Sequence, residues 1–260
     1  MIMKKILLIL LTSLSLMAGM SVEEIVDKVD KRDLGDNSIG TTQMVLIDKN
    51  NKQRVRTLKT YSKYFGEDIY NAIFFLSPSD IKYTAFLTYD YDDASKDDDQ
   101  WLYLPALKLS KRIASSDKSA SFMGSDFSYS DMTSRNPEDY TYKIAKESKV
   151  GKNKVWIIES IPKEQKMVDE TGYTKSYLFV RQDNFVVVRA LHYLVDGKKK
   201  YMDVKELKFI DGIWVATKIE MKTKKQKQTL HTTVLKLSDV QFNQKLDDSF
   251  FTVRQIEKGI

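Results

Sequence analysis

The sequence of 260 residues contains no cysteine, only four prolines, ten glycines and two histidines. The absence of cysteine excludes a disulfide framework, so stability must come from a hydrophobic core, which a chain of this length can bury. Proline and glycine are too sparse to form a linker, and no fixed-period repeat divides the chain. These absences predict a single domain, which we place at residues 19–260.

The first 18 residues have the three-part layout of a secretory signal. Lys4 and Lys5 precede an apolar run from Ile6 to Met17, and the small residue Ala18 follows. The run is shorter than the about 20 residues that cross a bilayer, so a retained anchor is the weaker alternative. No cysteine follows it for lipid attachment. We therefore predict that residues 1–18 are a cleaved signal peptide and that the mature protein is periplasmic.

The net charge is small, and the charged residues are spread evenly along the sequence. The formal net charge is +6, and removal of Lys4 and Lys5 leaves +4. Basic residues alternate with acidic residues along nearly every segment, whereas a nucleic-acid-binding protein gathers Lys and Arg on one face. The composition therefore argues against nucleic acid as a partner.

Hydrophobic periodicity predicts one N-terminal helix followed by strands. Ser21 to Glu24 form a capping box, and Val22, Ile25, Val26 and Val29 share one helical face. After this helix the period changes to two, with favoured hairpin turns such as Asp196-Gly197 and Asp211-Gly212. The predicted strands are 39–48, 53–64, 69–76, 83–90, 100–104, 108–113, 140–149, 154–160, 173–181, 185–195, 199–210, 213–222 and 229–240.

Consecutive strands with short turns predict a long antiparallel meander. About eight strands already form a barrel that its own side chains fill, so a curved sheet of this size would enclose a cavity. Residues 69–76 and 83–89 are apolar on both faces, so each face must be covered. A sheet packed by helices on one side is the alternative explanation for these two strands.

No segment predicts a catalytic centre, a metal site or a cofactor site. His192 and His231 are far apart in strand patterns, which favours ordinary strand histidines over zinc ligands. The aspartates of residues 90–99 do not match a calcium-binding loop, so a solvated loop is favoured over a cation site. Ser115 and Lys118 have the spacing of a serine acyltransferase, but the companion motifs of that class are missing.

The segment from Trp101 to Met132 is unusual because an apolar strand leads into a long loop of small polar residues. The large residues of that loop are apolar or aromatic, and they have no reason to remain in water. A loop of this length is often a lid, which predicts closure over an apolar opening. The alternative is a loop pinned to an ordinary core by the same side chains.

This segment resembles the signature of the LolA-like outer-membrane lipoprotein-sorting family. The similar stretches are residues 99–107 (DQWLYLPAL), 112–113, 116–119, 122–127 (FMGSDF) and, at the end of the chain, 246–251. The resemblance covers essentially the whole mature chain. It implies an unclosed antiparallel β barrel wrapped around helices, mainly β with a few helices, with an apolar cavity that takes up acyl chains in the periplasm.

One feature departs from the lipoprotein carriers of that family. Their early strand carries an Arg followed by Pro and Asn, whereas residues 54–60 here read RVRTLKT. Lipid is therefore at least as good a cargo as lipoprotein, and the subgroup resembles periplasmic partners of inner-membrane RND-type lipid exporters. A lipid-sensing regulator of the same fold is the alternative, and a small outer-membrane barrel is disfavoured by charges on the strand faces.

The resemblance and the apolar residues together predict the binding site. An apolar cavity lined by aromatic residues and methionine can hold a hydrocarbon chain without specific bonds. Arg112 and Lys118, beside the predicted lid, are candidates for contact with an anionic headgroup, with solvated loop cations as the alternative. The predicted lipid-binding residues are Phe74, Phe86, Trp101, Tyr103, Leu104, Ile113, Phe122, Met123, Phe127 and Tyr129.

Overall fold

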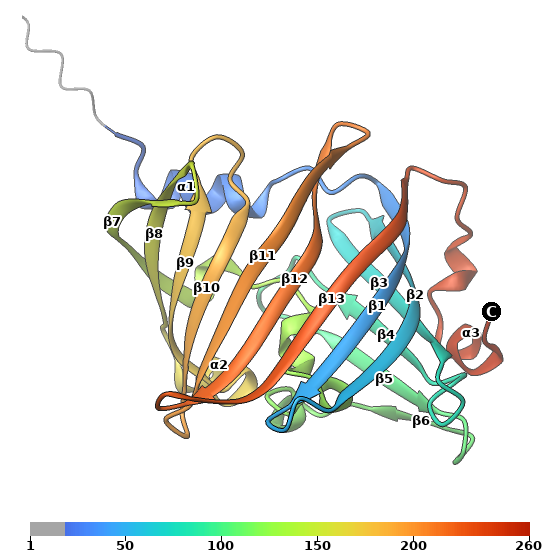
Figure 1. Cartoon of the computed structure of the whole chain (residues 1–260). Coiled ribbons are helices and arrows are strands. Elements are labelled where there is room, and N and C mark those ends of the chain that lie inside the picture. The colour runs from blue at the N-terminus through green and yellow to red at the C-terminus, as the bar shows by residue number, and fades with distance from the viewer. Residues whose placement is uncertain (1–18) are drawn as a thin grey trace, which may run out of the picture.

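The computed structural model describes residues 19–260, so the predicted signal peptide at 1–18 lies outside the described residues. Within them, thirteen antiparallel strands form one curved sheet that does not close (Figure 1). The strands are β1 (Asn37–Asp48), β2 (Gln53–Phe65), β3 (Asp68–Ser77), β4 (Ala85–Asp90), β5 (Asp99–Leu104), β6 (Leu109–Arg112), β7 (Tyr140–Val150), β8 (Asn153–Pro162), β9 (Tyr173–Arg181), β10 (Val187–Leu194), β11 (Lys199–Ile210), β12 (Ile213–Lys225) and β13 (Gln228–Phe242).

The helices are short. They are α1 (Val22–Asp30), α2 (Gln165–Thr171) and α3 (Val253–Lys258), with 3-10 turns η1 (Ser115–Asp117), η2 (Phe122–Gly124), η3 (Tyr129–Met132), η4 (Pro137–Asp139) and η5 (Asp248–Phe250). None of these described helices has the length and apolar character that crossing a bilayer requires.

The predicted strands are confirmed, each within a few residues of its expected ends. The period-two pattern works here because alternate side chains of a strand face opposite sides of the sheet. The favoured turn Asp211-Gly212 joins β11 to β12 with both residues at positive φ (49° and 88°), as a type I′ hairpin turn requires.

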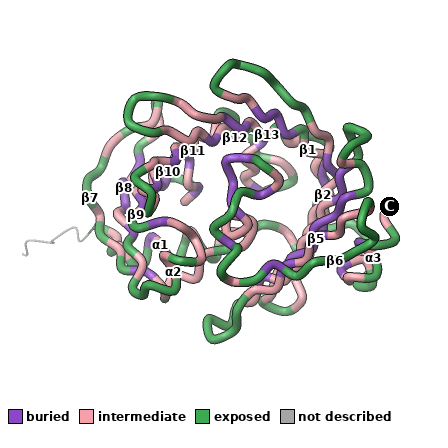
Figure 2. Tube along the Cα trace, turned by 90° about the horizontal axis from the view of Figure 1, so that it is seen from below, coloured by how far each residue is buried: buried purple, intermediate pink, exposed green. Residues whose placement is uncertain are grey.

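The prediction of a fully consecutive meander is wrong at one point. The strand order is β6-β5-β4-β3-β2-β1-β13-β12-β11-β10-β9-β8-β7, so β6 and β7 form the two edges and β1 pairs with β13. The chain therefore starts in the middle of the sheet, reaches one edge, crosses to the other and returns. We call residues 113–139, which make this crossing, the crossover segment. It runs through the inside of the curved sheet (Figures 1 and 2).

The N-terminal helix α1 forms as its sequence predicts. Ser21 Oγ accepts from the backbone N–H of Glu24 at 3.1 Å, and the Glu24 carboxylate accepts from Ser21 N at 2.8 Å, which completes the capping box. Its apolar face packs on β8 and β9. Ile25 of the helix is buried there against Ile158 of β8 and Val180 of β9.

Both faces of β3, β4 and β5 are covered, as their sequence predicts, but by different parts of the chain. Phe86 and Leu102 face the crossover segment, while their neighbours Leu87 and Trp101 face the C-terminal residues. Phe251 and Ile256 cover that second, outer face, where α3 lies (Figure 1). Helix α3 therefore seals the outside of the sheet and leaves the inside to the crossover segment.

Candidate functional site

The inner face of β1–β5 is an apolar wall. Its buried side chains come from alternate positions of five neighbouring strands. The crossover segment adds Ile113 and Phe122, both buried, and the partly buried Met123, Tyr129 and Met132. The wall residues are Met44, Leu46, Leu58, Phe75, Phe86 and Leu102. The space in which we expected an apolar cavity is therefore occupied by the protein's own crossover segment.

Part of the crossover segment is a small hairpin, residues 118–130, which we call the inner hairpin. Phe122 N donates to Phe127 O at 2.8 Å, and Ser130 N donates to Lys118 O at 2.9 Å. At its tip, Met123 has φ 51° and Gly124 has φ 73°. The left-handed conformation favours glycine and strains most other residues, so Gly124 allows the sharp reversal. These two hydrogen bonds and the Ser121–Ser128 bridge lie within the inner hairpin.

A buried aspartate fastens the tip of the inner hairpin to β12 and β13. The Asp126 side chain is 1% exposed, and its Oδ2 lies 2.7 Å from both Thr233 Oγ1 and His231 Nδ1. Thr223 donates to Oδ1 at 2.5 Å, and Arg56 donates to the carbonyl oxygen of Met123. A buried carboxylate is tolerated only when it is hydrogen-bonded in this way.

A second buried group fastens the other end of the inner hairpin. Asp131 accepts from Tyr173 Oη at 2.9 Å and from Ser128 N at 2.8 Å, and Lys200 Nζ lies 3.5 Å away. Burial is the largest single influence and raises the pKa of Asp131, but the charges of Lys200 and Arg135 and the hydrogen bond from Ser128 N together outweigh it and hold the pKa below its usual value. Asp131 therefore remains ionised and keeps its partners in place.

The strand histidine His192 packs beside this group. Its ring stacks on Tyr173 with centroids 4.5 Å apart, and its Nδ1 lies 2.7 Å from Ser176 Oγ. Burial lowers the pKa of His192 to about 3, so the ring is neutral at neutral pH.

The predicted lipid-binding residues do not surround one space. Those on the inner side of the sheet are Phe86, Leu104, Ile113, Phe122, Met123 and Tyr129. Phe74, Trp101 and Tyr103 lie on the outer face, where they pack with the C-terminal residues. The alternation of β3 and β5 puts these three on the far side of the sheet. Phe127 is buried within the inner hairpin. Lipid contact by the inner residues stays a prediction.

The two headgroup candidates lie in different environments. Arg112 pairs with Asp99 at the β6 edge, and its side chain is 63% exposed. The Lys118 side chain is only 6% exposed, with Glu170 Oε2 at 3.9 Å. Lys118 is therefore not the solvated loop cation of the alternative reading, and the two cations do not form one anion site.

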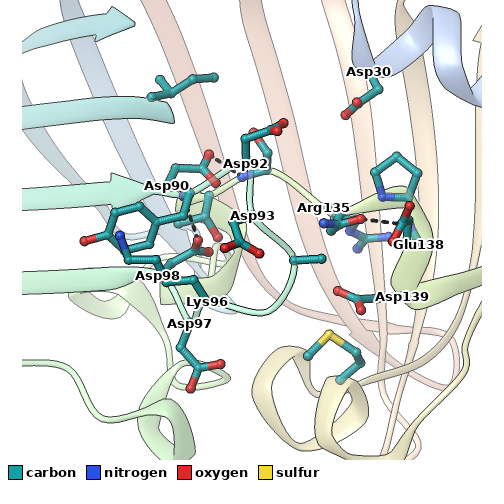
Figure 3. Close-up of a pocket in the computed structure, with 18 of the residues that line it drawn as sticks. Asp30, Asp90, Asp92, Asp93, Lys96, Asp97, Asp98, Arg135, Glu138 and Asp139 are labelled. Carbon is teal, nitrogen blue, oxygen red and sulfur yellow. Dashed lines mark hydrogen bonds between the residues drawn. The ribbon is translucent and has the colours of Figure 1, made fainter. Parts of the chain in front are cut away.

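A cavity of about 1010 Å³ opens beside the crossover segment, between α1, the 91–98 turn and α2 (Figure 3). Carboxylates dominate its lining, among them Asp30, Asp92 and Asp139. It is thus polar, unlike the apolar cavity that the sequence predicts. The described residues contain no group of three or more side chains placed to hold a metal ion.

Three aspartates of the 90–99 segment, Asp90, Asp98 and Asp99, are wholly or partly buried, which corrects the prediction of a solvated loop. Asp90 is 7% exposed and accepts from Ser134 N at 2.7 Å, while Asp98 is half-buried. Burial raises the pKa of Asp90 to about 6, and it also raises the pKa of Asp98. These carboxylates hold the end of the crossover segment near β4 rather than projecting freely into solvent.

The raised pKa of Asp90 predicts a pH-dependent effect of Asp90→Asn. The folded state binds this proton more tightly than the unfolded state, so the destabilisation is present above pH 6 and is lost as the pH falls toward 3.8. A shift of this size corresponds to about 3 kcal/mol at most. We expect Asp90→Asn to raise the melting temperature at pH 8 by several degrees and to change it little at pH 4.

Calorimetry at the two pH values checks this expectation. Asp93→Asn in the same turn is the matched control, because Asp93 is exposed and its pKa is lowered by hydrogen bonds from Ser95. A melting temperature of Asp90→Asn that falls at pH 8 would show that the Asp90 charge is stabilising.

Comparison with known proteins places this arrangement in a family. A protein-family model described as "Uncharacterized protein" matches residues 67–258. An outer-membrane lipoprotein-sorting protein domain from Vibrio parahaemolyticus is 31% identical, with a TM-score of 0.81, and the match covers 90% of this chain and 97% of that chain. The chain belongs to the LolA-like outer-membrane lipoprotein-sorting family.

Two further solved structures share the fold of this LolA-like protein. A DUF1329 family protein from Desulfovibrio piger is 31% identical, with a TM-score of 0.81 and coverage of 89% of this chain and 96% of that chain. A LolA superfamily protein from Nitrosomonas europaea is 20% identical, with a TM-score of 0.69 and coverage of 91% and 99%, and it supports the fold alone. No curated protein matches the chain.

The polar anchors of the inner hairpin are the part of the site that sequence reasoning missed. Asp126 lies within the FMGSDF stretch that resembles the LolA-like signature, so a signal for its importance was present. Nothing near Asp126 in sequence identifies its partners, because Thr233 and His231 lie more than 100 residues away. The partner of Asp131, Tyr173, gives equally little sign of this role in its strand pattern.

Proposed function

We propose that this LolA-like protein is a periplasmic carrier that binds the acyl chains of a lipid or lipoprotein on the inner face of β1–β5. The inner hairpin occupies the place of the hydrocarbon in the structure described above. The observation that carries the proposal is that the apolar wall is covered by this hairpin instead of a second sheet or a packed helix. We propose that the hairpin can leave the wall.

Transfer of an acyl chain from water to the wall can offset the cost of moving the inner hairpin away. Each CH₂ exposed to water costs about 0.8 kcal/mol, or roughly 12 kcal/mol for a sixteen-carbon chain, so the cargo needs an apolar wall. When the hairpin leaves, its anchors Asp126 and Asp131 and their partners can bind water instead. The acyl chain then covers the wall that Phe122 exposes. Opening without cargo leaves the wall in water, which keeps the empty carrier closed.

We further propose that the protein shuttles its cargo toward the outer membrane with an inner-membrane RND-type exporter as its loading partner. The relationship to a lipoprotein-sorting domain and the predicted signal peptide support this placement. The direction of transfer then comes from the partners that load and unload the carrier, and the role is binding rather than catalysis.

Native mass spectrometry of the protein purified without detergent from its own cell envelope tests this function. We expect part of the population to carry an added mass of one lipid or one acylated peptide. Loss of that mass after incubation with acceptor lipid vesicles would support the carriage of lipid between membranes. A protein that is free of lipid when purified, and that takes up no fluorescent fatty acid in solution, would contradict the proposal.

A further inference from the structure

The turns at one end of the curved sheet differ in charge from those at the other end. Because the strands are antiparallel, successive hairpin turns alternate between the two ends, and the pairing of β1 with β13 continues this alternation across the sheet. We call one set of turns the basic rim; it lies at the lower end in Figure 1. The basic rim consists of residues 49–52, 78–84, 105–108, 195–198 and 226–227, and the β8–β9 connection, residues 163–172, lies at the same end.

Lysine dominates the basic rim. Its acidic residues are Asp80 and Asp196, and its lysines are Lys49, Lys52, Lys82, Lys108, Lys198 and Lys227. The turns at the opposite end contain more acidic residues than lysines, and Lys96 and Lys152 are among their lysines. The acidic residues there are Glu67, Asp92, Asp93, Asp97, Asp98, Asp183 and Asp211. The β8–β9 connection adds two lysines and three acidic residues to the basic end, which still has more lysines than acidic residues. The evenly spread charge of the sequence therefore folds into turns with an excess of lysine at one end and an excess of acidic residues at the other.

Large apolar side chains are exposed among the lysines of the basic rim. Leu107 is 66% exposed and Leu109 is 53% exposed at the β5–β6 turn, and Tyr83 is 59% exposed at the β3–β4 turn. Val195 is 64% exposed at the β10–β11 turn, and Val55 near the β1–β2 turn is 44% exposed. These side chains come from the rim turns or from the strand residues next to them, and each is at least 44% exposed.

We propose that the basic rim docks on the surface of an anionic lipid bilayer. Lysines next to exposed apolar side chains match such a surface, because the lysines approach the anionic headgroups while Leu107, Leu109 and Tyr83 enter the boundary of the acyl region. An acidic protein surface would satisfy the lysines alone and would leave the apolar side chains in water. The proposal does not depend on the proposed carrier function.

Docking at this rim presents the tip of the inner hairpin to the bilayer. His231, which holds Asp126, pairs with Asp48, the last residue of β1 before the rim turn. A small cavity of about 160 Å³ at this end is lined by Leu46, Asp48, Lys52, Arg54 and His231. The rim therefore lies at the end of the apolar wall where the hairpin tip is fastened.

Vesicle sedimentation with the chain from residue 19 onward tests the docking. We expect binding to vesicles of phosphatidylcholine mixed with phosphatidylglycerol, weakened by salt, and little binding to pure phosphatidylcholine. The double change Leu107→Asp and Leu109→Asp should lower the partition coefficient at least about tenfold. Lys108→Gln should lower it about fivefold.

Matched variants at the acidic end provide the control. Phe209 is 61% exposed beside the β11–β12 turn, so Phe209→Asp should leave vesicle binding unchanged, as should Lys152→Gln. All these positions are exposed, and an unchanged melting temperature confirms that each variant folds. Three results would each overturn the proposal: no binding to anionic vesicles, an equal loss with Phe209→Asp, or rim variants that abolish only self-association or protein binding.

Discussion

Phe86→Ala is expected to destabilise the protein more than Phe122→Ala, although both rings belong to one buried cluster. Phe86 is 0% exposed and Phe122 is 1% exposed, with ring centroids 5.0 Å apart. Truncation of a fully buried phenylalanine costs about 3–5 kcal/mol when the site cannot relax. We expect that cost for Phe86, which lies on β4 between β3 and β5, and about 2 kcal/mol or less for Phe122.

The difference follows from what each residue is attached to. Phe86 belongs to the paired strands of the wall and stays in place unless the sheet unfolds. Phe122 belongs to the inner hairpin. If this hairpin leaves as a unit, as we propose, the loss of stability from Phe122→Ala cannot exceed the free energy of that local opening. Phe122→Ala also raises the fraction of open molecules and should therefore strengthen fatty acid binding.

Urea denaturation and titration with a fluorescent fatty acid measure both effects. Equal losses of unfolding free energy for the two variants, with weaker fatty acid binding by Phe122→Ala, would show that the crossover segment is a permanent part of the core. That outcome would support the alternative reading of the long loop as a pinned loop.

The strands could be predicted from the sequence because their signals are local. Alternating side chains and turn pairs such as Asp211-Gly212 specify each hairpin within a dozen residues. Pairing of β1 with β13 joins residues about 200 positions apart, and no local pattern encodes it. The short helix α2 was missed because seven residues provide too few turns for a helical period to be recognised.

The composition of the site was predicted better than its arrangement. Phe122, Met123 and Tyr129 were singled out because apolar side chains in a polar loop must be buried, and they do pack on the wall. Whether Trp101 or Leu102 faces the inside depends on the phase of β5, which its sequence leaves open because both faces are apolar. The polarity of the large cavity depends on segments brought together only by the fold.

An engineered disulfide between the inner hairpin and the residue that joins α2 to β9 can hold the hairpin on the apolar wall. A Cβ atom at Gly172 would lie 3.5 Å from the Cβ of Ser119, which is within the range of roughly 3.5–4.5 Å for a disulfide. Ser119 belongs to the inner hairpin and Gly172 lies between α2 and β9. The protein has no cysteine of its own, so a disulfide within one molecule of the Ser119→Cys, Gly172→Cys variant can only join these two positions.

Gly172 has φ 73°, so a cysteine there adds backbone strain. The reduced form of the same variant carries the same strain and is the matched control. Because the hairpin is bonded internally from Lys118 to Ser130, fixing its base restrains the whole unit.

Fatty acid binding by the oxidised and reduced forms of this double-cysteine variant tests most directly whether the inner hairpin must leave the wall to admit an acyl chain. Our account predicts that oxidation lowers the affinity for a fluorescent fatty acid at least about tenfold and that a reductant restores it. Equal affinity of the two forms, with the disulfide verified by mass spectrometry, would contradict the account.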